Sequence, residues 1–112
     1  MSGAHPMRPI EFLVLAVLAE EHRHGYGIVQ ELQRRTNGRV QVKPGNLYRV
    51  LDRLMERGHL EEDEELPATE LDNQRRRYYR ITDEGRRVLT EEASLLGTFV
   101  DHVRSTLPGE AV

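Results

Sequence analysis

Arginine is the residue whose number and spacing in this sequence point most clearly to a chemistry, and that chemistry is the binding of phosphates or bases. The chain has 16 basic residues, of which only Lys43 is a lysine. A guanidinium group presents a planar fork of donors that fits a phosphate or the edge of a guanine. A GC-rich genome also favours arginine, so composition alone leaves both explanations open.

Two groups of arginines have the spacing of a nucleic-acid interface. Arg49 and Arg53 lie on the polar face of a segment whose other face is apolar. Arg75-Arg76-Arg77 precede a strand-like segment, and because side chains alternate along a strand, two of the three can face DNA. The alternative is that Arg49 and Arg53 pair with Asp52 and Glu56 on a solvated helix face.

Other chemistries have little support in the sequence. The chain contains no cysteine, which excludes disulfides, thiolate metal ligands and a cysteine nucleophile. A glycine-rich phosphate loop and a nucleophile-like serine motif are also missing, so we expect neither an enzyme nor a cofactor. His22 and His24 form a His-x-His pair without further ligands at fixed spacing, so we expect no metal. We expect His24 to cap or pack against the start of a helix.

Length and charge indicate one small domain. A chain of 112 residues matches the commonest domain size. No apolar run approaches the ~18 residues of a membrane span, and the residues before Ile10 do not resemble a signal peptide, so we expect a cytoplasmic protein. The net charge of −3 does not by itself indicate a nucleic-acid binder. However, residues 1–58 carry an excess of basic residues and residues 59–112 an excess of acidic ones.

Apolar residues recur with helical periodicity in three segments that come before the arginine triplet. The first predicted helix begins at Pro9 and runs to about residue 20 or 21. The second follows Gly25 and stops at Asn37-Gly38. The third opens at Pro44-Gly45 and ends at Gly58. It has the apolar and polar faces that a recognition helix needs.

The remaining segments predict a small sheet and a last helix. Residues 39–42 alternate like a short strand, and residues 60–64 and 75–81 read as two antiparallel strands. Thr82 can cap a helix that runs to about Leu107. This order predicts a mainly α protein with a small β-wing (α+β), that is, a winged helix-turn-helix. We divide it into a DNA-binding domain, residues 8–82, and a C-terminal dimerisation helix, residues 83–107.

The last helix has an apolar stripe too wide for one small domain to cover. Its spacing alternates between four and three residues, which is typical of a coiled-coil seam. We therefore expect it to pack against the same helix of a second subunit. The alternative is a helix folded back on its own core. The seam comprises Leu89, Ala93, Leu96, Val100, Val103 and Leu107, with Phe99 beside it.

Four segments resemble the PadR-like transcriptional regulators. His24-Gly25-Tyr26 is similar to the start of that family's second helix, and residues 44–51 resemble its recognition-helix motif. Residues 54–60 resemble the exit from that helix, and residues 76–85 the passage from the wing to the last helix. The matches cover about residues 10–90 in the right order, and the single C-terminal helix is typical of the smaller subfamily.

The resemblance implies a homodimeric winged-helix repressor. Its recognition helix would enter the major groove of a palindromic double-stranded operator, and its wing would touch the neighbouring minor groove or backbone. Asn46 stands where the family often has Thr or Ser, and Lys43 where it often has a small capping residue. The resemblance also adds Tyr48 to the DNA-facing candidates. The full set is Lys43, Gly45, Asn46, Tyr48, Arg49, Arg53, Arg75, Arg76 and Arg77.

The resemblance further implies a small aromatic or lipophilic effector bound near the dimer interface. A different function, a winged-helix module that binds proteins and not DNA, is favoured by the negative net charge and the acidic run at residues 61–65. Exposure of Arg49 and Arg53 on the same side as Arg76 and Arg77 would favour DNA. The candidate effector-lining residues, which are otherwise core residues, are Phe12, Leu95, Leu96 and Phe99.

Overall fold

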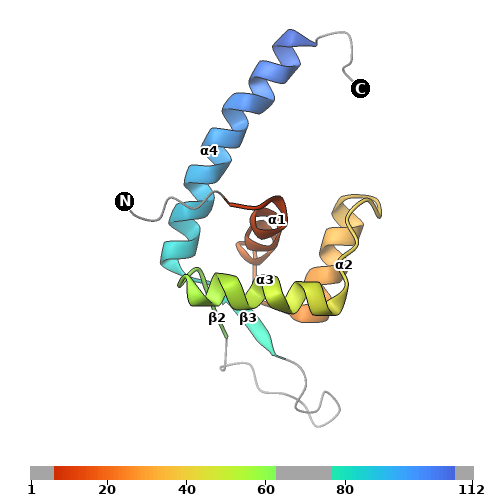
Figure 1. Cartoon of the computed structure of the whole chain (residues 1–112), viewed down its shortest axis with the longest axis vertical. Coiled ribbons are helices and arrows are strands. Elements are labelled where there is room, and N and C mark those ends of the chain that lie inside the picture. Colours follow the sequence, from red (N-terminus) through yellow and green to blue (C-terminus); the bar gives the residue numbers. More distant parts are fainter. Residues whose placement is uncertain (1–6, 63–76, 108–112) are drawn as a thin grey trace.

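The computed structural model describes residues 7–62 and 77–107. Three short helices pack around a common core beside a small sheet, and a long fourth helix projects from this body (Figure 1). None of the helices in the described ranges is long and apolar enough to cross a membrane. The elements in chain order are α1 (Pro9–Leu18), β1 (Arg23–His24), α2 (Gly25–Arg35), α3 (Pro44–Glu56), β2 (Leu60–Glu62), β3 (Tyr78–Ile81) and α4 (Asp83–Thr106).

The sheet has three antiparallel strands in the order β1-β3-β2. Strands β2 and β3 form the predicted wing, with Leu60 opposite Ile81. The strand predicted at residues 39–42 is wrong, because β1 takes the free edge of β3. The backbone of residues 39–42 is held locally instead: the Val40 N–H donates to the hydroxyl of Thr36 at 3.0 Å. Val40 and Val42 alternate because both pack against the core, not because they belong to a sheet.

The helix boundaries follow local signals in the sequence. Asn37 and Gly38 both have positive φ, and the Gly38 N–H donates to the Gln33 carbonyl at 2.8 Å, which terminates α2 as predicted. Gly58, with a φ of 82°, ends the turn after α3 in the same way. The first helix stops at Leu18, two or three residues before the end predicted at residue 20 or 21, and a turn follows it.

The core joins one face of each of the first three helices to the inner face of the sheet. Helix α1 lies at its centre and is apolar almost all round. Complete burial of a leucine or valine contributes roughly 1.5–3 kcal/mol, so this cluster fixes the relative positions of α2 and α3. The buried apolar residues are Val14, Leu15, Val17, Leu18, Ile28, Leu32, Leu47, Val50, Leu51, Leu54, Leu60, Tyr79 and Ile81.

Gly85 fixes the angle at which α4 leaves the body. A Cβ atom at this position would lie 2.2 Å from the His59 carbonyl oxygen and 2.8 Å from Ile81 Cγ1, so only glycine allows this approach. Thr82 caps the helix as predicted, accepting the Gly85 N–H at 2.9 Å. The Thr82 hydroxyl also donates to the Gly58 carbonyl at 2.6 Å. The start of α4 is thus attached to the end of α3.

Only the first turns of α4 pack against the described part of the body. Val88 and Leu89 are partly buried and pack against the core, so Leu89, which the heptad spacing includes in the seam, is partly covered within the chain. Beyond these turns the helix does not fold back on the domain, and it projects into solvent (Figure 1). The described part of the body therefore leaves the rest of its apolar stripe uncovered.

Candidate nucleic-acid interface

Helix α3 divides cleanly into a buried and an exposed face. Leu47, Val50, Leu51 and Leu54 enter the core, and the polar residues between them face solvent. Pro44 occupies the first turn, where an N–H would have no partner within the helix. Within the described ranges, no side chain caps the N-terminus of this helix. Its backbone N–H groups and positive dipole end are therefore available to an anion.

The sequence-predicted DNA-facing residues of α3 lie mostly on this exposed face. Lys43, Gly45, Asn46 and Arg49 are all exposed. Tyr48 is 45% exposed, and a Cβ on Gly25 would lie 3.2 Å from its hydroxyl. The N-terminal turns of α2 and α3 therefore approach each other closely, as in a helix-turn-helix.

Arg53 has a different environment, which the sequence did not reveal. Its Nε donates to Glu11 Oε2 at 3.0 Å, and Arg57 Nη1 donates to Glu11 Oε1 at 3.2 Å. Glu11 is completely buried in α1, whereas both arginines stay 30% exposed. Arg53 thus joins α3 to α1 and presents only part of its guanidinium group to solvent. Its acidic partner is Glu11, and not Asp52 or Glu56 as in the alternative interpretation of the sequence.

The carboxylate of Glu11 stays ionised despite its burial. Burial raises its pKa, but hydrogen bonds from the Arg8 backbone N–H and from Arg53, and the charge of Arg57, outweigh that effect. The pKa of Glu11 therefore lies below its ordinary value. The same carboxylate accepts the Arg8 N–H at 3.0 Å, which fixes the start of α1.

Glu11 does have a signal in the sequence, although the helical pattern hides it. It is the one charged residue in the apolar decapeptide that forms α1. A charge there must be paired if the helix is buried. Arg53 and Arg57, four residues apart at the end of α3, supply the partners.

The wing contributes basic residues that are already paired. Arg77 is 66% exposed and lies 3.2 Å from Glu62, and Arg80 lies 2.8 Å from Glu61. The first two residues of the acidic run are therefore neutralised by arginines on or beside the neighbouring strand. Arg75 and Arg76, like residues 63–65, fall outside the described residues.

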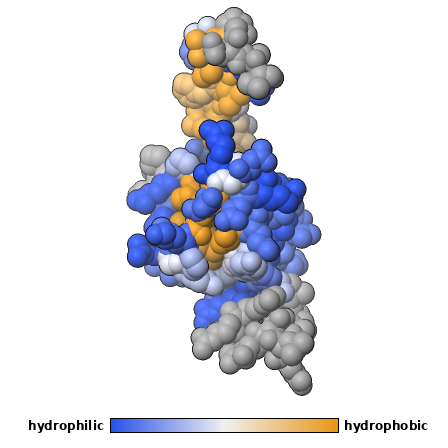
Figure 2. All heavy atoms as spheres, turned by 90° about the vertical axis from the view of Figure 1, so that its right-hand side faces the viewer, coloured by the Kyte–Doolittle hydropathy of each residue, from blue (hydrophilic) through white to orange (hydrophobic). Residues whose placement is uncertain are grey.

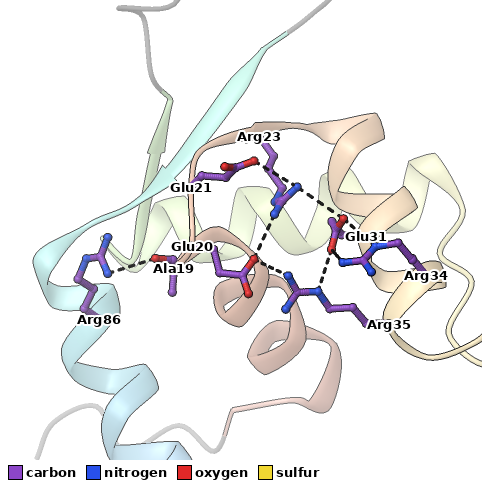
Figure 3. A network of polar contacts seen from close by, with 8 residues as sticks. All are labelled: Ala19, Glu20, Glu21, Arg23, Glu31, Arg34, Arg35 and Arg86. Atoms are coloured by element: carbon purple, nitrogen blue, oxygen red, sulfur yellow. Dashed lines mark hydrogen bonds and ion pairs between the residues drawn. The ribbon is translucent and has the colours of Figure 1, made fainter.

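A second set of arginines lies around the end of α1, β1 and α2. Arg23, Arg34 and Arg35 share the carboxylates of Glu20 and Glu31 in a continuous network (Figure 3). Hydrogen bonds from Arg34 and Arg35 lower the pKa of Glu31 to about 2. Glu21 also lies 3.6 Å from Arg23, so three acids balance the charge of these three arginines.

His24 has the structural role predicted for it. Its Nδ1 accepts the Gly27 N–H at 3.0 Å, which caps α2. Its ring also meets the edge of Tyr78 at a centroid distance of 5.3 Å and stacks near Tyr26. The imidazole thereby joins the start of the helix-turn-helix to the wing.

The projecting part of α4 carries an apolar surface, which is seen in orange on the upper part of the molecule in Figure 2. Ala93 is exposed within it. Of the residues predicted to line an effector site, Phe12 is partly buried in α1 and the others are exposed on α4. The exposed large apolar residues of this surface are Leu95, Leu96, Phe99, Val100, Val103 and Leu107.

Comparison with known proteins gives a consistent result. Residues 14–91 match the model of the transcriptional regulator PadR-like family. An uncharacterised protein of Lysinibacillus sphaericus is 37% identical over 82 residues, which cover 73% of this chain and 72% of that protein.

Solved structures agree in fold. A PadR-like transcriptional regulator from Bacillus cereus superimposes with a TM-score of 0.74 at 29% identity, covering 90% of this chain and 93% of that one. A PadR family transcriptional regulator from Eggerthella lenta gives a TM-score of 0.67 at 30% identity, covering 88% and 80%. The wing and the three helices before it are thus those of a regulator fold.

Proposed function

The chain belongs to the PadR-like family of transcriptional regulators, and we propose that it acts as a homodimeric, sequence-specific DNA-binding repressor. One observation carries this proposal. The exposed face of α3 presents Lys43 and Arg49, and neither has an ion-pair partner within the ranges 7–62 and 77–107. Asp52 and Glu56 are exposed farther along the helix, so the unpaired cations belong to its N-terminal half. An unpaired cationic surface on a helix that the core holds from behind suits a polyanion.

The contacts we propose follow from position on α3. Arg49, at the centre of the exposed face, would read a guanine edge, and Asn46 would read adenine or bind a phosphate. Lys43 and the backbone N–H of Gly45 would hold a phosphate at the helix N-terminus. Arg75 and Arg76 would add backbone contacts from the wing, which strengthen binding without reading sequence. Arg77 would join them by exchanging its contact with Glu62 for a phosphate.

Dimerisation through α4 is supported by its uncovered apolar face. Six large apolar side chains between Leu95 and Leu107 are 39–59% exposed. A contiguous apolar surface of this kind marks an interaction site. Its heptad spacing suits a second copy of the same helix. A two-fold axis through α4 would carry two recognition helices to successive major grooves, about 34 Å apart.

A small aromatic or lipophilic effector is part of the same proposal. Leu95, Leu96 and Phe99 stand on the α4 face that a partner would cover, and Phe12 on α1 is partly buried. A ligand held among such side chains would alter the angle between paired α4 helices. Because each recognition helix is attached to its own α4 through Gly85 and Thr82, a change of angle would change the spacing between the two helices.

Selection from a random pool of duplexes tests the DNA-binding function. The proposal predicts enrichment of a palindrome whose half-sites are about 10 base pairs apart, with affinity that falls steeply as salt rises. Failure to enrich any duplex at low salt, by protein shown to be dimeric, would contradict it and favour the protein-binding module.

Sedimentation of α4 variants tests the dimer separately. Val100→Asp places a charge in the apolar face and should yield monomers. Thr98→Asp, at an exposed position away from that face, should leave the dimer intact. If the two variants sediment with the same apparent mass, α4 is not the interface.

A further inference from the structure

A shallow hollow lies beside α3, between the start of α1 and the segment that links α2 to α3. Its volume is about 520 Å³. Arginines from three separate parts of the chain line it: Arg8, Arg39, and the pair Arg49 and Arg53. Its remaining lining is largely apolar and includes Val50. Arg8 and Arg39 were not among the residues that the sequence pointed to.

The hollow carries an excess of positive charge. Of its four arginines, only Arg53 has an acidic partner among the described residues, the buried Glu11, and Arg57 shares that carboxylate. Arg8, Arg39 and Arg49 are exposed and make no ion pair within the described ranges. Because Glu11 is completely buried, its charge does not face an incoming anion.

The backbone beneath these arginines is held firmly. The Arg8 N–H donates to Glu11 Oε1 at 3.0 Å, and the Arg39 N–H donates to the Thr36 carbonyl at 3.0 Å. Both side chains therefore start from fixed positions near α3's exposed face. Such pre-organisation lowers the entropic cost of binding.

The shape of the site favours a nucleic-acid backbone over a small anion. Pockets for small molecules enclose most of the ligand, whereas Arg8, Arg39 and Arg49 stand exposed around an open surface. The hollow also continues into the exposed face of α3, because Asn46 and Arg49 belong to both. In Figure 1 the wing strands extend beyond α3 on the side away from α1.

We propose that Arg8 and Arg39 form a phosphate-binding flank beside the recognition helix, which holds the DNA backbone on the edge of the groove opposite the wing. This inference rests on the proposed DNA-binding function and adds to it. It assigns to these two residues affinity without sequence specificity, since phosphate contacts position a protein but do not read bases.

Salt dependence of binding tests the flank, with the selected palindromic duplex and a mixed-sequence duplex as probes. Removal of one phosphate contact should reduce the slope of log K against log salt by about 0.9, or by about 1.8 in a dimer, where the substitution occurs twice. We expect this for Arg8→Ala and for Arg39→Ala, with the same decrease in affinity for both duplexes. Arg34→Ala, which removes an exposed but ion-paired arginine, is the matched control and should keep the wild-type slope.

The outcomes separate the two proposals. Wild-type protein that binds DNA, together with an unchanged slope in the Arg8→Ala/Arg39→Ala double variant, overturns the flank alone. Wild-type protein that binds neither duplex overturns the DNA-binding function and the flank with it. An unchanged slope, with a rise in unfolding temperature in benzoate that Arg39→Ala abolishes, would overturn the flank and identify a small-anion site instead.

Discussion

Two surfaces of this protein are rich in arginine, but among the residues that the structure describes the arginines have acidic partners on one surface and lack them on the other. On one, Arg23, Arg34 and Arg35 are paired with the carboxylates of Glu20, Glu21 and Glu31 (Figure 3). On the other, beside α3, Arg8, Arg39 and Arg49 have no acidic partner in the described part of the chain. The first surface fastens helices together, and the second is left with charge for a partner.

Overall charge is therefore a poor guide to what this protein binds. The net charge is −3, yet Glu11 is buried, and Glu61 and Glu62 are paired with arginines of the wing. Asp52 and Glu56, which are exposed on α3, lie beyond Arg49 on its C-terminal half. What matters for a polyanion is the local excess of unpaired cations. Glu11 lies between the two cases, because this acid is buried behind α3 and holds Arg53 and Arg57 in place without being exposed at the surface.

Removal of Glu11 should have the largest effect on stability, because it breaks both ion pairs that join α1 to the end of α3. We expect Glu11→Ala to lower the free energy of unfolding by about 2–3 kcal/mol, less than the roughly 3–5 kcal/mol of fully buried pairs, since both arginines keep some exposure. Urea unfolding measures the change. Glu20→Ala removes a 47% exposed carboxylate from the surface network; it is the control and should shift the midpoint much less. Equal shifts would mean that the Glu11 pairs add no more than surface pairs do.

Removal of an unpaired arginine should affect DNA binding and not stability. Arg49→Ala should weaken binding by about 1–3 kcal/mol at one base position if it reads guanine. A decrease that is uniform across sequences would identify a phosphate contact. Arg34→Ala should bind within about twofold of wild type, as expected of a surface arginine already paired. Titration of both variants against the selected duplex compares the two surfaces, and equal decreases would show that pairing does not distinguish them.

Lowering the pH should break the ion pairs that Glu11 makes with Arg53 and Arg57. The folded-state pKa of Glu11 lies below its ordinary value of 4.5. Its charge therefore stabilises the fold above that pH, and this contribution disappears as pH falls through the folded-state pKa. We expect the difference in urea midpoint between wild type and Glu11→Gln to narrow below pH 4.5. A difference that stays constant as the pH falls to about 3, well under the ordinary range for glutamate, would show that the charge of Glu11 does not contribute.

The smallest change in DNA affinity is expected from a substitution that leaves a paired arginine without its acidic partner. Glu62→Gln should free Arg77 on the wing, which lies 3.2 Å from Glu62. We expect DNA binding at low salt to tighten by at most about fivefold, the range of exposed ion pairs, and the gain to vanish at high salt. Weaker binding would mean that Glu62 orients Arg77 and does not compete for it.

Local signals made most of the fold predictable. Pro44, the Asn37-Gly38 stop, the Thr82 cap and the apolar periodicity of α3 each act within a few residues, and the structure confirms them. The strand predicted at residues 39–42 was wrong because strand pairing depends on which segment reaches the edge of β3. Alternation in sequence cannot distinguish a strand from a segment packed on a core.

The candidate site was predictable only in part, for a related reason. The exposed face of α3 follows from its own periodicity, so Arg49 and Asn46 could be placed from sequence. The pairing of Arg53 with Glu11 joins residues 42 positions apart. The hollow likewise brings Arg8 and Arg39 together with α3 only through packing. The spacing of residues within one segment does not predict contacts between residues that are distant in the sequence.

An NMR titration of the arginine Nε–Hε signals, assigned by substitution, would test the division between paired and unpaired arginines most directly. The selected duplex is added stepwise while all of these signals are followed together. We predict that the signals of Arg8, Arg39 and Arg49 shift on binding while those of Arg23, Arg34 and Arg35 stay in place. Shifts confined to the paired network, with the signals beside α3 unmoved, would contradict this division.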